Sequence, residues 1–488
     1  MDSIFWIKSE QDNVYLIDIV NKNIGLVHPY LPYLYYQNPD GKCLLDEGEQ
    51  EYYKNKLRYY IKHGIISEKT EAKNELLTIT KESVNENLAN VKQIVFETTE
   101  KCNLRCNYCI YGEFYSKEIP QQKDIKSSTM KEVVRYLSEK QLSSQNYSSK
   151  NTLYISFYGG EPLINFSAIK DVVDYNKKGK FQNRVIKFSM TTNGTLLDKY
   201  IDFMVENNVN ILVSLDGDKE NHQYRVYKNG RSSFDKIMSN IEYIKNKYPT
   251  FFENNVNFAS VLHNKNSVEQ VHSFFKQKFG KTPSILELNN SGILDNKKAD
   301  FDKTYKNKTE SMKEASNYDE IQKDMFIATK PYQSVLIFLF QYSKFIFKSY
   351  EDILSPDHLN RYISTGTCAP FSRKIFVTTT GEILPCEKIS HEYSLGKIED
   401  NGEITIDSEA IAEKYNYYLK LLERQCKHCY QQLNCTQCIF FIENLNERPV
   451  CKGFMNKKDF VFYLRENMSF LESHPQDYMK MMTEVLIS

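Results

Sequence analysis

The stretch Ile94-Val-Phe-Glu97, followed by Cys102-Asn-Leu-Arg-Cys106-Asn-Tyr-Cys109, decides how this chain folds. The first part is a short apolar run typical of a buried strand, and the second spaces three cysteines as C-x3-C-x2-C. A closed zinc site needs four ligands, and so does an iron–sulfur cluster held by protein alone. Three thiolates on one loop therefore favour a cubane cluster with one open iron, with half of a zinc site or buried thiols as the alternatives.

Strands and helices alternate between residues 91 and 300. This alternation predicts an α/β fold with a parallel sheet and helices outside it. Only six units are visible, whereas a full barrel has eight, so we expect a partial (β/α)6 TIM-like barrel. The strand candidates are Ile94–Glu97, Leu153–Phe157, Lys187–Thr192, Asn210–Ser214, Val256–Leu262 and Ile285–Leu288.

Polar clusters follow the first four strand candidates, where an α/β barrel carries its chemistry. Each cluster alone is an ordinary turn, because Gly, Pro, Asn-Gly and Asp-Gly are common there. Their alignment with the cysteines indicates a functional site. The candidates after strands two to four are Gly159, Gly160, Glu161, Pro162, Thr192, Asn193, Ser214, Asp216, His222 and Arg225.

The chain has 488 residues, enough for several domains. We expect a small α+β domain over 1–68, with strands at Val14–Val20 and Ile24–His28 and a helix around Glu51–His63. Residues 69–90 are expected to be a linker or a surface helix. The barrel spans 91–300, and a bridging region with an exposed polar start spans 301–367. A cysteine-rich domain covers 368–452, and a C-terminal helix covers 453–488.

Composition excludes several classes of protein. The 63 basic and 63 acidic residues give a net charge of zero, which predicts no nucleic-acid partner and no membrane partner. The N-terminal residues lack the pattern of a signal peptide, and the longest apolar run is too short to span a bilayer. Eleven cysteines without an export signal favour metal ligation over disulfides, and we expect a cytoplasmic protein.

Seven cysteines lie between residues 368 and 451, and Cys43 stands alone. Two C-x2-C pairs within this group are also typical of a pair of zinc ribbons, so a zinc-binding interaction protein is the non-enzymatic alternative. The seven are Cys368, Cys386, Cys426, Cys429, Cys435, Cys438 and Cys451.

The triad, the Gly159-Gly160-Glu161-Pro162 motif, Ser214 and Asp216 together resemble the radical S-adenosylmethionine (SAM) superfamily. The resemblance implies a [4Fe–4S] cluster on Cys102, Cys106 and Cys109, with SAM on the open iron. Reductive cleavage of SAM would give a 5′-deoxyadenosyl radical. Tyr108 would lie near adenine, the Gly159–Glu161 backbone near the methionine amine, Ser214 near the ribose, and Arg225 near the carboxylate.

The C-terminal cysteines resemble the SPASM domain, which implies two auxiliary [4Fe–4S] clusters. By this resemblance Cys368, Cys386 and Cys438 hold the first. Seven thiolates leave one of eight iron positions open in the two clusters, and a substrate thiolate, another side chain or water would fill it. Cys426, Cys429, Cys435 and Cys451 hold the second. The last pair is C-x2-C, whereas the family usually has C-x3-C. Glu387 matches the position of an acidic general base in some SPASM enzymes.

Residues 1–68 resemble the winged-helix-like domain that binds a leader peptide by strand addition in peptide-modifying radical SAM enzymes. We therefore expect an enzyme that matures a ribosomally made precursor peptide, with flavodoxin or ferredoxin as electron donor. The expected product is an intramolecular cross-link, a Cys thioether first and a carbon–carbon or aromatic cyclophane link second. Oxidation of Cys or Ser to formylglycine, as in anaerobic sulfatase maturation, is the alternative reaction.

Overall fold

The computed structural model describes residues 2–36, 45–67, 75–76, 78–115, 122–146, 152–179, 181, 184–290, 292–325, 330–344, 346, 361–362, 365–432, 435–442 and 444–484. The chain divides into two compact units. The first unit comprises Met1–Thr78, Phe326–Thr367 and Asn416–Ser488, and the second comprises Ile79–Met325 and Cys368–Tyr415.

A ten-stranded sheet forms the framework of the second unit. Its order is β10-β9-β8-β7-β6-β5-β12-β13-β14-β15. Strands β5 to β10 are parallel to their neighbours, β12 adds in parallel to β5, and β13 to β15 are antiparallel. The bounds are β5 Gln93–Thr99, β6 Thr152–Gly159, β7 Val185–Thr192, β8 Asn210–Ser214, β9 Val256–Leu262, β10 Ser284–Glu287, β12 Lys374–Val377, β13 Glu382–Leu384, β14 Gly396–Ile398 and β15 Ile404–Thr405.

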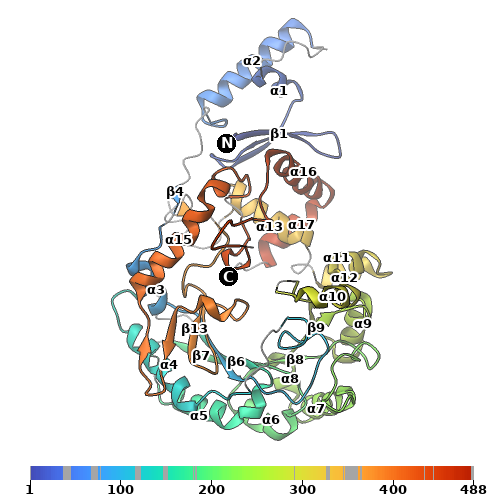
Figure 1. The fold of residues 1–488 in the computed structure, drawn as a ribbon. Helices are drawn as coiled ribbons and strands as arrows, with labels where there is room; N and C mark the ends of the chain where they lie inside the picture. The colour runs from blue at the N-terminus through green and yellow to red at the C-terminus, as the bar shows by residue number, and fades with distance from the viewer. Residues whose placement is uncertain are drawn as a thin grey trace. The chain divides into compact units, whose positions relative to one another are not determined.

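Helices connect the parallel strands and cover one side of them. Figure 1 shows α4 to α9 in an arc outside the strands. In α7 the residues Ile237, Ile241 and Ile244 are buried, which is the spacing of one helix face. The bounds are α3 Lys81–Ala89, α4 Ser127–Lys140, α5 Phe166–Asn176, α6 Leu197–Glu206, α7 Phe234–Lys247, α8 Pro249–Asn255 and α9 Val268–Phe279.

The strands alternate between two environments with a period of two residues. In β8, Ile211 and Val213 are buried, whereas Asn210, Leu212 and Ser214 are half-buried. The buried set packs under the helices, and the other set faces the concave side of the sheet. The predicted α/β class and the six parallel strands are therefore confirmed, and all six candidates coincide with β5 to β10.

Residues 301–325 differ from the exposed connection that their polarity predicts. They form the end of α10 (Lys298–Thr304), α11 (Lys308–Lys313) and α12 (Tyr318–Asp324). Each helix buries one large apolar side chain, namely Phe301, Met312 and Ile321, and α10 and α11 also bury Thr304 and Ser311. The expectation of an exposed connection was wrong because one buried apolar residue per short helix leaves no visible periodicity.

Two further segments contain more structure than the sequence pattern indicates. Residues 69–90, predicted to be a linker or a surface helix, contain α3, which is capped by Thr80 and buries Val84 and Leu88. In the cysteine-rich region, β12 to β15 are only two to four residues long. Strands this short are hidden from a search for alternation, and β12 pairs with β5 across about 280 residues of sequence.

The first unit begins with an antiparallel sheet in the order β1-β2-β3, followed by two helices. Strands β2 (Val14–Asp18) and β3 (Asn23–Val27) match the two predicted strands, and α2 (Glu47–Lys62) matches the predicted helix. Strand β1 (Ile4–Lys8) and helix α1 (Tyr30–Tyr36) were missed. A short parallel pair joins β4 (Glu75–Leu76) and β11 (Arg361–Tyr362).

The hydrophobic core of the first unit contains side chains from both the N-terminal sheet and the C-terminal helices. Helices α13 (Lys330–Tyr342), α16 (Lys457–Ser473) and α17 (Pro475–Glu484) lie together beside β1 (Figure 1). Phe460 of α16 contacts Phe5 of β1 edge-to-face, with 5.1 Å between ring centroids. Aromatic and aliphatic side chains therefore hold the N-terminal sheet against the C-terminal helices.

None of the described helices combines the length and the apolar character needed to cross a bilayer.

Candidate active site

The cysteine triad lies on the loop that leaves β5, at the carboxyl edge of the parallel strands. Its backbone is held by the segment after β8, because the Arg105 N–H donates to the Val226 carbonyl at 2.7 Å and the Asn107 N–H to the Tyr224 carbonyl at 3.1 Å. Burial raises the pKa of Cys102 to about 11 and that of Cys106 to about 12. Such thiols stay protonated without a metal, and a bound cluster would displace their protons.

Gly159 and Gly160 allow the end of β6 to touch the start of the cysteine loop. The Gly160 N–H donates to the Thr99 carbonyl at 2.8 Å, and the Glu161 N–H donates to the Lys101 carbonyl at 2.8 Å. A Cβ atom on Gly160 would lie 2.3 Å from the Lys101 oxygen. The two glycines therefore serve the packing of backbone on backbone, and Pro162 starts the buried turn that follows.

The Glu161 carboxylate joins β6 to the end of β7. It accepts from the Asn193 N–H at 2.7 Å, from the Thr192 hydroxyl at 2.8 Å and from the Leu163 N–H at 3.2 Å. Burial raises its pKa to about 7, and these donors oppose the rise. Asn193 in turn directs its amide towards Cys102 Sγ at 3.7 Å. These contacts therefore fix Cys102 relative to the end of β7.

Asp216, two residues after β8, is the centre of a buried polar network. Its carboxylate accepts from Arg225 Nε at 3.0 Å, from the Val261 N–H at 2.9 Å and from the Tyr108 hydroxyl. Burial alone would raise the pKa of Asp216, but the positive charge of Arg225 holds it below its usual range. The Arg225 guanidinium also lies over the Tyr108 ring, 5.4 Å from its centroid. The structure thus brings together three residues that the sequence singled out.

His222 supports this network in one tautomer. The Asp216 N–H points at His222 Nδ1 at 3.3 Å, so Nδ1 accepts and the proton lies on Nε2. Nε2 then donates to the Ser233 hydroxyl at 3.0 Å, which donates to the Arg225 carbonyl at 2.8 Å. Burial lowers the pKa of His222 to about 4, so the ring is neutral near pH 7.

Ser214 ends β8 and is half-buried on the concave side of the sheet, opposite Ala259 in register. Its position is compatible with a ribose contact, which stays a prediction.

Glu387 follows Cys386 after β13 and is paired with a lysine. Lys374 Nζ lies 3.0 Å from both carboxylate oxygens, and the Cys386 thiol lies 3.6 Å from one of them. Burial would raise the pKa of Glu387, but Lys374 lowers it below its ordinary value. The residue is therefore an ionised carboxylate that can accept a proton, and its role as a base stays a prediction.

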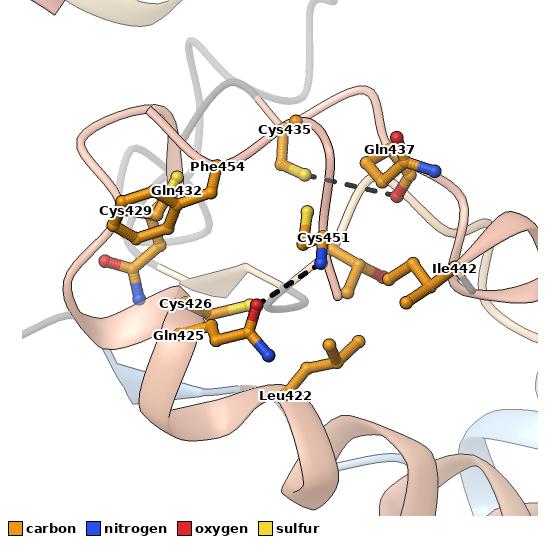
Figure 2. Close-up of a pocket in the computed structure, with 12 residues that line it drawn as sticks. Leu422, Gln425, Cys426, Cys429, Gln432, Cys435, Gln437, Ile442, Cys451 and Phe454 are labelled. Atoms are coloured by element: carbon orange, nitrogen blue, oxygen red, sulfur yellow. Dashed lines mark hydrogen bonds between the residues drawn. The ribbon is translucent and has the colours of Figure 1, made fainter. Parts of the chain in front are cut away.

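A cavity in the first unit is lined by the four cysteines that the sequence assigns to the second auxiliary cluster. Figure 2 shows Cys426, Cys429, Cys435 and Cys451 around one space, on the end of α15 (Ser408–Lys427) and the loops after it. Three glutamines and a few apolar side chains complete the wall. Four thiols around one cavity are the donor set that an iron–sulfur cluster uses.

The remaining cysteines are placed as follows. In the second unit, Cys368 is exposed, with Arg373 Nη1 4.0 Å from its sulfur, and Cys386 is half-buried. In the first unit, Cys438 is half-buried, and Cys43 lies outside the described residues. Among the described residues, no three His, Cys, Asp or Glu side chains converge closely enough to hold a single metal ion. The first auxiliary set stays a prediction.

Sequence reasoning missed two residues at the strand ends. Glu97 of β5 is buried and accepts from the Tyr111 hydroxyl at 2.8 Å and the Thr379 N–H at 3.1 Å. Tyr158 of β6 lies opposite Glu97 in register. Burial, followed by the charges of Glu387 and Cys109, raises the pKa of Tyr158 to about 12. Tyr158 could have been identified from the sequence, because side chains alternate between the two faces of β6 and Tyr158 shares a face with Ser156.

Residues 96–276 match the family model of the radical SAM superfamily. The chain therefore contains a radical SAM domain, as the resemblance predicted. This superfamily consists of enzymes that use a [4Fe–4S] cluster and SAM, which is the cofactor chemistry expected from the triad.

Two curated relatives show the range of proteins that this chain is similar to. A cysteine-type anaerobic sulfatase-maturating enzyme of Clostridium novyi is 31% identical over 198 residues, 39% of this chain and 49% of that protein. The radical SAM cyclopropyl synthase TigE of Paramaledivibacter caminithermalis is 30% identical over 178 residues, 35% of each chain. The chain thus spans half or less of the length of these relatives.

A longer but weaker match is to a cysteine-type anaerobic sulfatase-maturating enzyme of Clostridium perfringens, 25% identical over 67% of this chain and 83% of that one. Among solved structures, native anSMEcpe with bound AdoMet has a TM-score of 0.51 at 18% identity. That match covers 81% of this chain and all of the other. The structural likeness shows a common fold.

Proposed function

We propose that this protein is a radical SAM peptide maturase with a SPASM-type C-terminal region. It would abstract a hydrogen from a ribosomally made precursor peptide and form an intramolecular cross-link, with a Cys thioether as the favoured product. The observation that carries the proposal is the presence of two separate thiol sites: the triad after β5 and the four-cysteine cavity. When bound at the triad, a cluster with SAM supplies the 5′-deoxyadenosyl radical.

The residues around the triad would bind and orient SAM. Tyr108 is held by Asp216 next to the third cysteine, which would fix its position near the adenine of SAM. Arg225 uses Nε for Asp216, which leaves the outer nitrogens of a planar fork for a carboxylate. On this arrangement Asp216 orients two contacts to SAM and does not contact SAM itself.

Glu387 would accept the proton that leaves the Cys thiol as the thioether forms, and the electron released with it would pass to a cluster bound by the auxiliary cysteines. Its pair with Lys374 keeps the carboxylate ionised, and its neighbour Cys386 belongs to the proposed first auxiliary set. A proton taken by Glu387 would leave a protonated carboxyl beside a lysine, so Lys374 also limits how strongly that proton is held.

A peptide substrate is supported by the relatives. A solved structure of native anSMEcpe contains bound AdoMet and a Cp18Cys peptide, so that enzyme binds a peptide. For this chain, the N-terminal sheet offers a place for the leader. Among the described residues β3 pairs on one side only, with β2, and Leu26 of β3 is 64% exposed. An unpaired strand edge accepts an extended peptide as an added strand.

Helix α2 lies near β3 and exposes aromatic side chains. None of its residues is buried, and Tyr52 and Tyr59 are each more than half exposed. His28, just after β3, stacks on Tyr53 with 4.2 Å between ring centroids. Apolar leader side chains would pack against these rings, whereas the strand edge would supply backbone hydrogen bonds.

Anaerobic reconstitution of the full chain with iron and sulfide tests the cofactor part of the proposal. Three cubane clusters predict about twelve irons per chain and reductive cleavage of SAM to 5′-deoxyadenosine. Cys102→Ala should abolish SAM cleavage, whereas Cys43→Ala, outside all predicted cluster sets, should leave it unchanged. Purified protein with zinc and no iron would favour the zinc-ribbon alternative.

A short cysteine-rich reading frame beside the gene would supply the substrate for the second test. The peptide is incubated with enzyme, SAM and reductant, alkylated, and weighed by mass spectrometry. A thioether removes two hydrogens and one alkylatable thiol. A loss of two hydrogens with every thiol still alkylated would instead indicate a carbon–carbon or cyclophane link.

Maturation of a sulfatase is the second candidate, favoured by the long match to the C. perfringens enzyme. Conversion of a Cys side chain to formylglycine replaces sulfur by oxygen and removes two hydrogens. The same mass spectrometry with a sulfatase-derived Cys peptide distinguishes the two reactions. A leader peptide that binds the protein with no need for a sulfatase sequence would favour the cross-linking maturase.

A further inference from the structure

The four-cysteine cavity draws its ligands from two stretches of chain. Cys426 lies in the last turn of α15 and Cys429 just after it, whereas Cys451 comes from a loop more than 20 residues later. A cluster needs all of its thiolates at one place, so the Cys451 loop must be fixed relative to α15. Figure 2 shows the side chain of Gln425 reaching from the helix to the backbone of Cys451.

Gln425 makes two hydrogen bonds to the loop, one to Pro449 and one to Cys451, on either side of Val450. Its Nε2 donates to the Pro449 carbonyl at 2.6 Å, and its Oε1 accepts from the Cys451 N–H at 3.3 Å. Both halves of the amide are used, and a carbonyl can only accept while an N–H can only donate. The amide therefore has one correct orientation, which fixes the backbone on both sides of Val450.

The other cysteines of the cavity are held by different means. Cys429 Sγ accepts from the Met455 N–H at 3.3 Å. The Cys435 segment is backed by Gly366, where a Cβ atom would lie 2.2 Å from the Cys435 carbonyl oxygen. The Thr367 hydroxyl accepts from the Ile439 N–H at 2.7 Å. Gln425 thus links the backbone at Cys451 to the helix carrying Cys426, whereas the Met455 N–H ties the end of the same loop to Cys429.

We propose that Gln425 is a positioning residue that holds Cys451 as the fourth thiolate of the second auxiliary cluster. The proposal rests on the proposed function, since it requires a cluster in this cavity. Gln425 would act through Cys451 and would not itself be a ligand. Loss of its amide would free the loop and leave a three-thiolate site, which a cubane tolerates poorly because its fourth iron is then exposed and easily lost.

The test uses the full-length protein reconstituted anaerobically with iron and sulfide. Gln425→Leu keeps the approximate size and removes both hydrogen bonds. We expect its iron content to fall by at least one iron per chain, with a new three-iron signal in the electron paramagnetic resonance spectrum after mild oxidation. We also expect alkylation of Cys451 by iodoacetamide, followed by mass spectrometry, to be at least tenfold faster than in the wild type.

Two comparison variants make the result specific. Gln425→Glu keeps the acceptor for the Cys451 N–H and loses the donor to Pro449. Its iron content and its rate of Cys451 alkylation should therefore lie between those of the wild type and of Gln425→Leu. This variant also decides the question if Gln425→Leu fails to fold. Lys420→Leu, an exposed change on the same helix, should match the wild type in all three measurements.

Full iron content and a protected Cys451 in both Gln425 variants would overturn the proposal. Failure of the cofactor part of the proposed function would look different, because the wild-type protein itself would then bind no iron, whichever reaction the enzyme performs. The wild-type sample therefore separates the two failures.

Discussion

Arg225 Nε lies 3.0 Å from Asp216 Oδ2, and neither side chain is more than 10% exposed. The same carboxylate oxygen accepts from the Tyr108 hydroxyl, next to the third cysteine of the triad. One buried carboxylate therefore fixes both an aromatic ring on the cysteine loop and a guanidinium that follows β8. Two parts of the proposed SAM site thus share a single anchor.

Asp216→Asn should destabilise the protein strongly. The amide keeps the shape of the side chain but leaves Arg225 as a buried cation without its counter-charge, at a cost of about 3–5 kcal/mol. Thermal or urea denaturation followed by circular dichroism measures the effect. The matched control is Asp235→Asn, because Asp235 pairs with Lys219 at 2.9 Å on the exposed surface. That surface pair contributes about 0–1 kcal/mol. Equal losses in the two variants would contradict the anchoring role of Asp216.

Arg225→Lys should weaken SAM binding more than it weakens the fold. Lysine keeps the positive charge beside Asp216 but loses the planar fork that can hold a carboxylate with two parallel bonds. We expect the KM for SAM in reductive cleavage to rise about tenfold or more, which corresponds to about 1.4 kcal/mol. Isothermal titration calorimetry with SAM on the reconstituted protein measures the Kd for SAM, which should rise by a similar factor. An unchanged KM would show that the outer nitrogens of Arg225 do not reach SAM.

The stability of the second unit should fall in acid through His222. Its folded pKa of about 4 lies below the ordinary value of 6.5, so the unfolded chain takes up the proton first. This contribution is complete above about pH 6.5 and is lost as the pH falls towards 4, up to about 3 kcal/mol. The groups that face the ring are Asp216, Arg225 and His263.

The variant His222→Asn separates the acid destabilisation caused by His222 from that caused by other titratable groups. The asparagine oxygen can still accept from the Asp216 N–H, whereas the bond to Ser233 is lost at a cost of about 1 kcal/mol at every pH. Denaturation midpoints between pH 4 and pH 7 should therefore fall less steeply in the variant than in the wild type. Parallel curves for the two proteins would rule out His222 as the source.

The class of fold could be predicted from the sequence because each parallel strand, and the polar residues that follow it, can be recognised from neighbouring residues alone. The alternation of strand and helix, and the polar residues at four strand ends, are visible within windows of about ten residues. The cysteine triad was identifiable for the same reason, since its three members lie within eight residues. These features required no knowledge of distant contacts.

Other features depend on distant contacts and left no local pattern. The hydrogen bond from the Thr379 N–H to Glu97 spans 282 residues of sequence. The pairing of β12 with β5 also joins segments about 280 residues apart. The roles of Glu161 and Asp216 also depended on the fold, because their carboxylates bind backbone N–H groups of neighbouring strands. Gln425 was missed because an isolated glutamine beside a cysteine has no distinguishing spacing.

Gly160→Ala should prevent the triad from binding its cluster. The new Cβ would lie 2.3 Å from the Lys101 carbonyl oxygen, so the end of β6 and the cysteine loop must separate. We expect about four fewer irons per chain after reconstitution and no reductive cleavage of SAM. The control is Gly25→Ala, where a Cβ atom meets nothing within 4 Å and the iron content should not change. Full iron content in Gly160→Ala would mean that the loop can shift without loss of the site.

Leu26→Ala and Tyr52→Ala should weaken leader binding and spare the chemistry of SAM. Both side chains are more than half exposed on the first unit, so their truncation should not disturb the fold. We expect the Kd for a fluorescently labelled leader peptide, measured by anisotropy, to rise about tenfold, since an exposed anchor residue contributes about 1–2 kcal/mol. Cleavage of SAM without peptide should match the wild type, because the triad lies in the other unit. A leader that binds both variants as tightly as the wild type would exclude this face as its site. The formylglycine reaction, which needs no leader, would then be the stronger candidate.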